Sequence, residues 1–571
     1  MPAASSPVAV PGQLLVRFEG QTTAAHARGL HASVGARVVR NLALPHLQLV
    51  QLPAGRSIDA AVDWYERQPG VAYAEPNAIR SFADTPDDPL FGNLWGLNNT
   101  GQTVEGVTGT PDADIDAPEA WRTTKGSPRV TVAIVDTGMA YDHPDLAPNA
   151  WTNAGESGAG KAKNGVDDDG NGYVDDRRGW DFLDHDNDPR DYDGHGTHVA
   201  GTVGAEGGNG VGVAGVNWNV RLMPLRTGDF YSPLDGIVDA YAYAIRNGAD
   251  VVQASLKGFV YSEAERDVIQ SGSKTLFVVA AGNEGDDTDV TPGYPCNYDL
   301  ANILCVAATD QRDGLASFSS YGASGVDLAA PGVDILSTLP VWETPIREDF
   351  ETSITGRWTT GGVNNSWGRQ YEPDLSYLLA DSPLNRYAND TNSWVQYASP
   401  VSLSGLKLCR LRYLIYHDLA PGDAMYVEAS TNGTTWARLA AWTGSSYPYF
   451  VQASHRLRRL DGEPNVLIRF HMVTNGSRTS DGVYVDIVRL RCFPTGDGYD
   501  GDEYFYNSGT SMATPHVAGA AALLWSAAPT ASVADIRRAL LRGVDELPSL
   551  AGKVSSGGRL NVKRSLRILL P

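Results

Sequence analysis

Three residues in separate blocks of the sequence could together carry out nucleophilic acyl transfer. Asp136 ends the apolar run VAIVD, His195 lies in DGHGTHVAG, and Ser511 lies in NSGTSMATPHVAG. A serine hydroxyl becomes a good nucleophile when an imidazole removes its proton, and a buried carboxylate stabilises the resulting imidazolium. Each residue alone also fits a structural part, as a turn former, a structural histidine or a helix cap. The chemistry therefore depends on a fold that brings the three side chains together.

The pattern around these residues predicts an α/β fold with a mostly parallel sheet. Apolar strands alternate with helical stretches such as SPLDGIVDAYAYAIRNG (232–248), which is typical of a doubly wound sheet. The expected strands include RVTVAIVD (129–136), ADVVQAS (249–255) and TLFVVAAG (275–282). Active residues of such sheets gather at the carboxyl ends of the strands, where Asp136 would lie. His195 and Ser511 would each begin a helix, whose dipole favours negative charge in the site.

The chain is long enough for several domains. Its 571 residues exceed the size at which one hydrophobic core stops growing. Residues 12–80 follow the order β-α-β-β-α-β, the ferredoxin-like pattern. The α/β alternation stops near residue 340, and period-two segments separated by turns predict an inserted antiparallel β-sandwich. The expected parts are an N-terminal segment (1–82), an α/β domain in two pieces (83–340 and 504–571), and the insert (341–503).

Composition and charge argue against some classes of function. The 45 basic and 67 acidic residues give a formal net charge of −22. A chain this acidic is a poor candidate for binding the phosphates of nucleic acid, whereas clusters of acidic side chains suit calcium. The longest apolar runs, such as LFVVAA (276–281), are too short to cross a membrane. Because no charged and apolar leader follows Met1, we expect either an intracellular protein or a secreted one whose signal was removed. We expect a monomer without nucleic-acid or membrane partners.

The four cysteines allow three disulfide pairings. Cys296 and Cys305 flank a short loop, and Cys409 and Cys492 lie in strand-like segments of the insert. Buried free thiols are the alternative. We favour secretion with two local disulfides, since such bonds persist in oxidising compartments.

Four blocks of the sequence resemble one family of enzymes. VAIVDTGMAYDHPDL, DGHGTHVAG and GTSMATPHVAGAAAL are similar to the signature blocks of the subtilisin-like serine proteases, in that family's order of Asp, His and Ser, and VVAAGNEG (278–285) matches a fourth block. The resemblance covers approximately 90–340 and 504–571. It implies that Ser511 is the nucleophile, His195 the general base and acid, and Asp136 the orienter of the imidazole. Asn283 would donate its amide to the oxyanion, alongside the backbone N–H of Ser511.

The resemblance also implies a substrate-binding segment. ADVVQASLKG (249–258) is similar to the family segment that pairs with an extended substrate and walls the primary pocket. The residues implied are Ser255, Leu256, Lys257 and Gly258, with Gly293 at the pocket floor, which would leave room for a large side chain. Lys257 departs from the family, which usually has glycine there. Its ammonium is either solvated at the rim or favours an acidic or polar residue just before the scissile bond.

Two acidic loops are candidate calcium sites. NGVDDDGNGYVDD (164–176) carries oxygen ligands at alternate positions with a glycine for the turn, like the front of an EF-hand loop. Its expected ligands are Asp167, Asp169, Asn171 and the Tyr173 carbonyl, completed by Asp175 or Asp176. WDFLDHDND (180–188) resembles a calcium loop of some thermostable family members, with ligands Asp181, Asp186 and Asp188. Solvated acidic loops without an ion are the alternative for both.

The expected function is that of a secreted serine endopeptidase that acts on proteins or peptides through an acyl-enzyme on Ser511, with structural Ca²⁺ and no cofactor for catalysis. The 12–80 unit resembles the inhibitory propeptides of the family, so a self-inhibited precursor would mature by cleavage within 80–88. The insert is either a spacer or a ligand-binding module resembling a jelly roll, and we expect it near the leaving-group side of the cleft. The rival hypothesis is a catalytically silent protein that binds through the insert. Relatives with a glutamate base are excluded by His195.

Overall fold

The computed structural model describes residues 9–78, 85–158, 160–229, 231–373, 375–496 and 503–570. The chain divides into two compact units, Met1–Ala83 and Asp84–Pro571. The predicted cleavage segment 80–88 falls partly outside the described residues, as does the end of the expected insert.

The N-terminal unit is a small α+β fold. Its elements are β1 (Ala9–Phe18), α1 (Ala24–Ser33), β2 (Arg37–Asn41), β3 (Leu47–Gln51), α2 (Ile58–Glu66) and β4 (Val71–Ala78). The sheet has the order β2-β3-β1-β4 with antiparallel neighbours. Both helices begin at capping hydroxyls, those of Thr23 and Ser57. Alternate residues of β1, such as Leu14 and Val16, enter a core with Tyr65 of α2. The ferredoxin-like prediction is confirmed.

The second unit is built on a nine-stranded sheet in the order β27-β28-β13-β12-β11-β10-β7-β9-β8. Its neighbours are parallel except for β27 and β28. The strands are β7 (Gly126–Asp136), β8 (Trp180–Asp181), β9 (Asn219–Arg226), β10 (Val251–Ala254), β11 (Leu276–Ala280), β12 (Ile303–Thr309), β13 (Leu328–Pro331), β27 (Asp545–Glu546) and β28 (Gly558–Arg559). Buried apolar side chains fill the central strands, as expected for a sheet covered on both faces.

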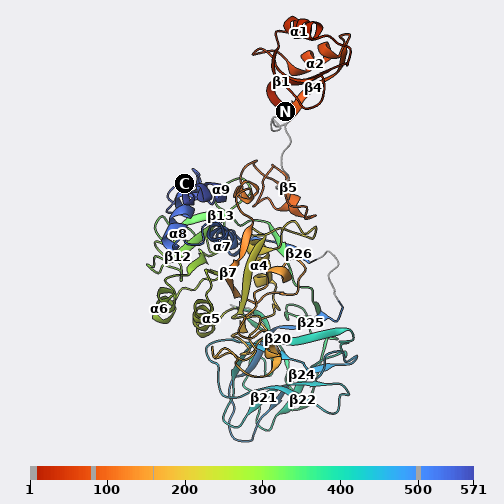
Figure 1. The fold of residues 1–571 in the computed structure, drawn as a ribbon. Helices are drawn as coiled ribbons and strands as arrows, with labels where there is room; N and C mark the ends of the chain where they lie inside the picture. The colour runs from red at the N-terminus through yellow and green to blue at the C-terminus, as the bar shows by residue number, and fades with distance from the viewer. Residues whose placement is uncertain are drawn as a thin grey trace. The chain divides into compact units, whose positions relative to one another are not determined.

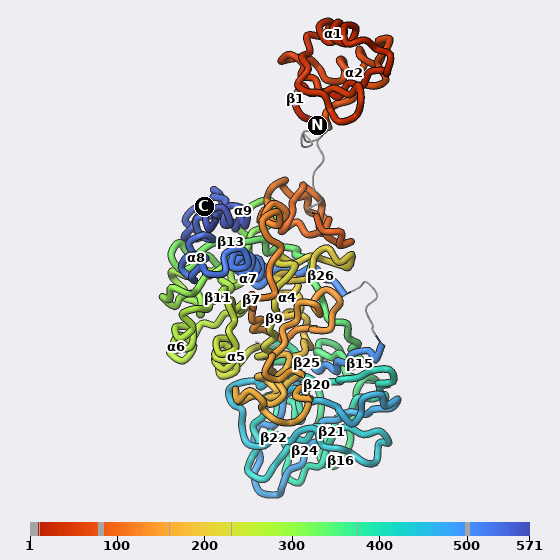
Figure 2. Tube along the Cα trace, viewed as in Figure 1, coloured from red at the N-terminus to blue at the C-terminus, as the bar shows by residue number. Residues whose placement is uncertain are grey.

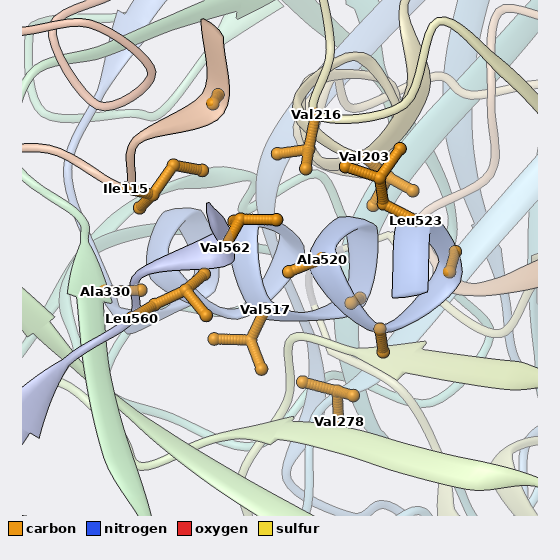
Figure 3. Packing of buried hydrophobic residues seen from close by; sticks show 14 of the residues in the cluster. Ile115, Val203, Val216, Val278, Ala330, Val517, Ala520, Leu523, Leu560 and Val562 are labelled. Atoms are coloured by element: carbon orange, nitrogen blue, oxygen red, sulfur yellow. The ribbon is translucent and has the colours of Figure 1, made fainter. Parts of the chain in front are cut away.

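Helices cover both faces of this sheet, so the doubly wound prediction is confirmed. The helices are α3 (Ala117–Trp121), α4 (His195–Gly204), α5 (Leu234–Arg246), α6 (Glu263–Ser271), α7 (Thr510–Ala527), α8 (Val533–Arg542) and α9 (Val562–Leu569). Residues of α4 and α7 share one core cluster, and those of α5 and α6 belong to another (Figure 1). In Figure 3, Val517, Ala520 and Leu523 of α7 lie among Val203 of α4 and Val278 of β11.

The helix α7 is buried on nearly every side because its sequence is rich in alanine and glycine. A Cβ atom on Gly519 would lie 2.7 Å from Val216 Cβ, so only glycine fits at that approach. Small residues let the helix lie close to the sheet, which places its first turn at the carboxyl ends of the strands.

The insert is a sandwich of two antiparallel sheets, which lie together in Figures 1 and 2. One contains β15 (Glu343–Glu348), β17 (Gly368–Glu372), β18 (Ser376–Ala380), β20 (Leu406–Asp418), β23 (Val451–Arg456) and β25 (Gly482–Pro494). The other contains β16 (Trp358–Val363), β19 (Asn392–Tyr397), β21 (Ala424–Ser430), β22 (Ala437–Trp442) and β24 (Leu467–Val473). Both sheets contribute to one apolar core. The predicted β-sandwich is therefore present.

A short antiparallel ribbon joins the insert to the α/β sheet. Strand β14 (Ile335–Thr338) pairs with β26 (Tyr504–Asn507), one on each side of the insert. The Nε2 atom of His198 in α4 lies 2.9 Å from the Ile335 carbonyl and 3.0 Å from the Phe505 carbonyl. Burial lowers the pKa of His198 to about 4, so this imidazole is neutral and holds both strands. The helix that carries Ser511 begins at Thr510, shortly after β26 ends at Asn507, so the ribbon helps to fix where this helix begins.

The structure contains two disulfides, between Cys296 and Cys305 and between Cys409 and Cys492. The second bond links the long strands β20 and β25 within one sheet of the insert. The cysteines are thus joined locally, within the α/β part and within the insert.

Candidate active site

Asp136 and His195 meet at the carboxyl edge of the sheet. Asp136 is the last residue of β7 and His195 the first residue of α4. The Nδ1–H of His195 donates to Asp136 Oδ1 at 2.7 Å, and the N–H of Thr137 donates to the same oxygen at 2.7 Å. Burial alone would lower the pKa of His195, but the Asp136 carboxylate outweighs it and raises the pKa to about 9. The pair is therefore arranged to stabilise an imidazolium.

A buried carboxylate that sequence reasoning missed holds the turn before His195. Asp191 accepts hydrogen bonds from Thr137 Oγ1 at 2.9 Å, from the N–H of Gly194 at 2.9 Å and from the N–H of Thr197 at 2.9 Å. It thereby ties β7 to the first turn of α4. The acidic stretch before GHGTH was the available signal, but its local partners could not be read from it.

Ser511 lies in the first turn of α7, next to the end of β10. Its Oγ donates to the Ser255 carbonyl at 3.4 Å, and Ser255 Oγ donates to the Ser511 carbonyl at 2.8 Å. Asn283 follows β11, and its Oδ1 accepts from the N–H of Thr510 at 2.8 Å and from Thr510 Oγ1 at 3.0 Å. With its oxygen engaged in this way, Asn283 has its Nδ2 donor to offer beside the helix start. The four sequence-derived catalytic residues thus lie at one sheet edge.

A cleft of about 560 Å³ opens at this edge. It is lined by Asp136, His195, Tyr231, Leu234, Ser255, Leu256, Lys257, Gly258, Phe259, Val260 and Tyr294, among others. Gly258 and Tyr294, both of which line the cleft, exchange two backbone hydrogen bonds of 2.8 Å. The expected substrate-binding segment therefore forms one wall of the cleft.

Lys257 folds into this wall and does not extend to the rim. Its side chain is 6% exposed, and its ammonium lies 2.8 Å from Glu284 Oε2. A Cβ on Gly293 would lie 2.2 Å from Lys257 Cε, and one on Gly282 would lie 2.3 Å from Lys257 Cδ. The expectation that Gly293 leaves room for a large side chain is therefore wrong, because the lysine stem lies over that glycine. The rim-lysine alternative does not hold either.

The first acidic loop gathers only some of the expected ligands. Among the described residues, carboxylate oxygens of Glu156, Asp169 and Asp176 lie within 4.8 Å of one another. Asp167 instead accepts backbone hydrogen bonds from its own loop, and Asp175 accepts them from Asn164 and Gly165. The carboxylates of Asp167 and Asp175 are thus not part of this cluster, and Asn171 reaches it through Nδ2, a donor, which lies 2.9 Å from Asp176 Oδ2. The Tyr173 carbonyl stays a predicted ligand.

Glu156 lies outside the sequence motif and was missed. Its side chain is buried, and Oε1 accepts from the N–H of Asp168 at 2.6 Å. Its Oε2 is buried without a hydrogen-bond partner among the described residues. Burial raises the pKa of Glu156. An orphaned, buried carboxylate oxygen next to two other carboxylates fits a hard cation.

The second acidic loop is occupied by guanidinium groups. Asp181 pairs with Arg226 and lies 3.8 Å from Arg410, and Asp188 lies 3.3 Å from Arg456. Asp186 Oδ2 lies 3.7 Å from Arg410. The prediction that Asp181, Asp186 and Asp188 bind a cation is therefore withdrawn, because arginines already supply the positive charge at these carboxylates. The sequence could not reveal this, since Arg410 and Arg456 come from β20 and β23 of the insert.

The same contacts show where the insert meets the α/β part. Arg412 of β20 donates to Asp229 Oδ2 at 2.6 Å and to the Tyr192 carbonyl, three residues before His195. Arg491 of β25 donates to that carbonyl as well. Burial lowers the pKa of Arg491 to about 10, and so do the neighbouring Arg412 and Arg489. Buried charges from two sheets thus join the insert to the loop that carries the histidine.

The insert also contacts the cleft wall. Tyr231, which lines the cleft, donates from its hydroxyl to the Phe450 carbonyl at 2.9 Å, and Gln452 Nε2 donates to the Tyr231 carbonyl at 2.7 Å. Tyr231 lines the same cleft as the Ser255–Gly258 segment that was expected to pair with the substrate. The insert therefore contacts a residue of the cleft lining directly, and its expected place near the leaving-group side stays a prediction.

A parallel α/β sheet with an Asp–His pair and a serine at a helix start defines a hydrolase site that uses a serine nucleophile. Comparison with known proteins gives the family. A family model described as "Subtilase family" matches residues 127–361 and 465–560, more than half of the chain, and one described as "Fervidolysin N-terminal prodomain" matches residues 2–77. The gap between the two subtilase segments lies within the insert.

Individual relatives agree with the family match. The chain is 35% identical over 335 residues to a thermophilic serine proteinase from Bacillus sp. (strain AK1), covering 58% of this chain and 72% of that protein. It is 36% identical over 230 residues to thermitase from Thermoactinomyces vulgaris, covering 40% of this chain and 71% of that protein. It is 32% identical over 365 residues to an extracellular protease from Xanthomonas campestris pv. campestris, covering 59% of this chain and 58% of that protein.

The chain belongs to the subtilase family. It is a subtilisin-like serine endopeptidase with an N-terminal prodomain, and the rival of a catalytically silent binding protein is not favoured.

Proposed function

We propose that this endopeptidase is secreted as a self-inhibited precursor and cleaves protein substrates through an acyl-enzyme on Ser511. The 2.7 Å hydrogen bond between His195 and Asp136, at the same sheet edge as the first turn of α7, carries the proposal. His195 removes the hydroxyl proton of Ser511, and the serine oxygen attacks the scissile carbonyl. His195 then gives this proton to the leaving amine. Asp136 holds the imidazole and stabilises its positive charge.

Asn283 and the backbone N–H of Ser511 stabilise the oxyanion of the tetrahedral intermediate. The Thr510 contacts to Asn283 Oδ1 orient the amide so that Nδ2 is the group offered to substrate. Removing one such donor costs about 10²–10³ in kcat, a range taken from a subtilisin and therefore from this same family.

The experiment is the pair Ser511→Ala and Ser526→Ala. Ser526 lies in the same helix, and its Oγ donates to the Ala522 carbonyl at 2.8 Å, so it is a matched control away from the cleft. The Ser526→Ala variant should mature and hydrolyse casein like the parent, and Ser511→Ala should stay at full length and be inactive. Casein hydrolysis by purified Ser511→Ala would contradict the proposal.

The precursor hypothesis concerns the N-terminal unit. The prodomain match at residues 2–77 supports an intramolecular inhibitor, and cleavage within 80–88 would release it. N-terminal sequencing of the mature enzyme tests the position. A mature form that keeps residues 9–78 attached by a peptide bond would refute this part.

Secretion is supported by the two disulfides and by extracellular relatives. No helix among the described residues is long and apolar enough to cross a membrane.

Structural calcium is proposed at Glu156, Asp169 and Asp176. Three carboxylates suit a hard cation that prefers oxygen ligands, and the orphaned Glu156 Oε2 gives it a buried ligand. Its contribution would be to neutralise the cluster and fix the 164–176 loop, with no part in the catalytic steps.

A further inference from the structure

The primary specificity pocket contains a side chain of the enzyme itself. Lys257 follows Ser255 and Leu256 in the cleft wall, and its aliphatic stem lies over both Gly282 and Gly293. These two glycines would otherwise leave open the space between the walls. We infer that Lys257 fills the floor of this pocket and restricts the enzyme to substrates with a small acyl-side residue. The acyl-side residue is the substrate residue whose carbonyl group belongs to the scissile bond. This inference rests on the proposed function, since it uses the same cleft and nucleophile.

The lysine is held in the pocket by the contacts of its ammonium group. The ammonium lies 2.8 Å from Glu284 Oε2 and 3.4 Å from Ser320 Oγ. Ser320 Oγ also donates to Glu284 Oε2 at 3.2 Å, which keeps the carboxylate in place. The ammonium lies 4.8 Å from the centroid of the Phe259 ring, a favourable cation–π position. With 6% of its side chain exposed, Lys257 resembles a core side chain more than a surface lysine.

The contacts around the stem exclude a large substrate side chain in the same place. A single methyl group on Gly293 would lie 2.2 Å from Lys257 Cε and 3.1 Å from Lys257 Cδ. A phenylalanine or leucine side chain that reached this floor would have to displace the stem. Such displacement would break the ion pair with Glu284 and expose the apolar stem to water. Alanine, glycine or serine ends above the stem and meets none of these costs.

The charge of Lys257 does not favour acidic substrates in this arrangement. Glu284 already neutralises the ammonium, and the ammonium in turn helps to keep the pKa of Glu284 below its ordinary value although partial burial opposes ionisation. An acidic acyl-side residue would bring a second carboxylate to one ammonium and would face Glu284 as a like charge. Selection is therefore by size, and the earlier expectation of a preference for acidic residues is replaced.

Two substitutions separate size from charge. Lys257→Gly removes the stem and opens the floor, whereas Lys257→Met keeps most of the stem and removes the charge. The substrates are internally quenched peptides that differ only in the acyl-side residue, which is alanine, leucine, phenylalanine or glutamate. The enzyme is obtained from the full chain, and active sites are counted by labelling Ser511 with a fluorophosphonate.

We expect the parent and Lys257→Met to prefer alanine to phenylalanine. Lys257→Gly should raise kcat/KM for phenylalanine relative to alanine by about 100-fold, the scale on which pockets discriminate by side-chain size. Glu284→Gln, which frees the ammonium, should raise kcat/KM for glutamate relative to alanine while the size preference stays.

Three results would overturn the inference. A parent that labels and cleaves after phenylalanine as well as after alanine shows that the lysine swings away. A parent that prefers glutamate, with the preference lost in Lys257→Met, shows selection by charge. An unchanged profile in Lys257→Gly shows that the stem does not set the pocket. A chain that neither labels nor cleaves any peptide refutes the proposed function itself, and the inference with it.

Discussion

Asp229 lies between two buried guanidinium groups, and replacing it should destabilise the second unit. Its Oδ1 accepts from Arg226 Nη2 at 2.8 Å, and its Oδ2 accepts from Arg412 Nε at 2.6 Å. Both arginine side chains are fully buried, one on β9 and the other on β20 of the insert. The substitution Asp229→Asn keeps the shape and removes the charge, so positive charge from two sheets is left in the interior without this counter-ion.

The size of the effect follows from this geometry. Breaking a buried, hydrogen-bonded ion pair by neutralising one partner costs about 3–5 kcal/mol. The second unit has about 490 residues, and an unfolding entropy of about 2.1 cal/mol/K per residue gives about 1 kcal/mol/K. The expected fall in Tm is therefore about 3–5 °C for a unit that melts cooperatively.

The assay is differential scanning calorimetry of full-length Ser511→Ala, which does not digest itself, with and without Asp229→Asn. Asp267→Asn is the matched control, because Asp267 lies 3.3 Å from Arg266 but is 68% exposed. Exposed pairs contribute less than about 1 kcal/mol, so this variant should melt within about 1 °C of the parent.

Acidification gives a second readout with a defined sign. Burial opposes ionisation of Asp229, but Arg226 and Arg412 outweigh it and hold the pKa below the ordinary value. The stabilisation is therefore present above the unfolded pKa of about 3.9 and is lost as pH falls through the lower folded pKa. The Tm difference between parent and Asp229→Asn should shrink in strong acid. Equal Tm values for the two proteins at pH 7 would refute the reasoning.

Three further predictions concern catalysis, the cation and the longer disulfide. The pKa of His195 is raised to about 9, so the fraction of its neutral base form increases as the pH approaches that value, and kcat/KM of the mature enzyme should rise with it. Asp136→Asn removes the charge that raises this pKa, so it should lower kcat by about 10⁴ and move the pH profile to lower pH. A profile that is flat above pH 7 would contradict this. Chelation by EGTA should lower the Tm of the parent and have little effect on Glu156→Gln, which already lacks the buried ligand; equal losses would place the cation elsewhere. Replacing Cys409 and Cys492 by alanine opens a disulfide with a sequence separation of 83 and should cost about 4.6 kcal/mol of stability. Replacing Cys296 and Cys305 by alanine opens one with a separation of 9 and should cost about 2.7 kcal/mol, so its Tm should fall less. The reverse order of Tm losses would contradict loop-closure entropy as the cause.

The sequence was most informative where structure is set locally. The strand ending at Asp136, the helix beginning at His195 and the helix whose first turn carries Ser511 follow from apolar runs and glycine-containing turns, which act within a few residues. The doubly wound order follows from strand–helix alternation, and the sandwich from period-two segments and turns.

The missed features depend on contacts between distant segments. Arg412 and Asp229 are 183 positions apart, so their pairing could not be read from either segment. The acidic loop 180–188 looked like a cation site because its sequence does not show the arginines that face it. Lys257 was recognised as a departure, but its direction depends on Gly282, Glu284 and Gly293.

The ribbon of β14 and β26 makes the insertion point a place where one inserted domain could be replaced by another. The N–H of Leu339 donates to the Glu503 carbonyl at 2.6 Å, so the chain leaves and re-enters the α/β part at one place, as in a hairpin whose loop has been replaced. The cost of closing a loop grows only slowly with its length, and a folded sandwich brings its own ends together. A different module, or a plain turn, could therefore be grafted between Leu339 and Glu503. Such a graft would also have to neutralise Asp181, Asp184 and Asp229, whose arginine partners come in part from the present insert.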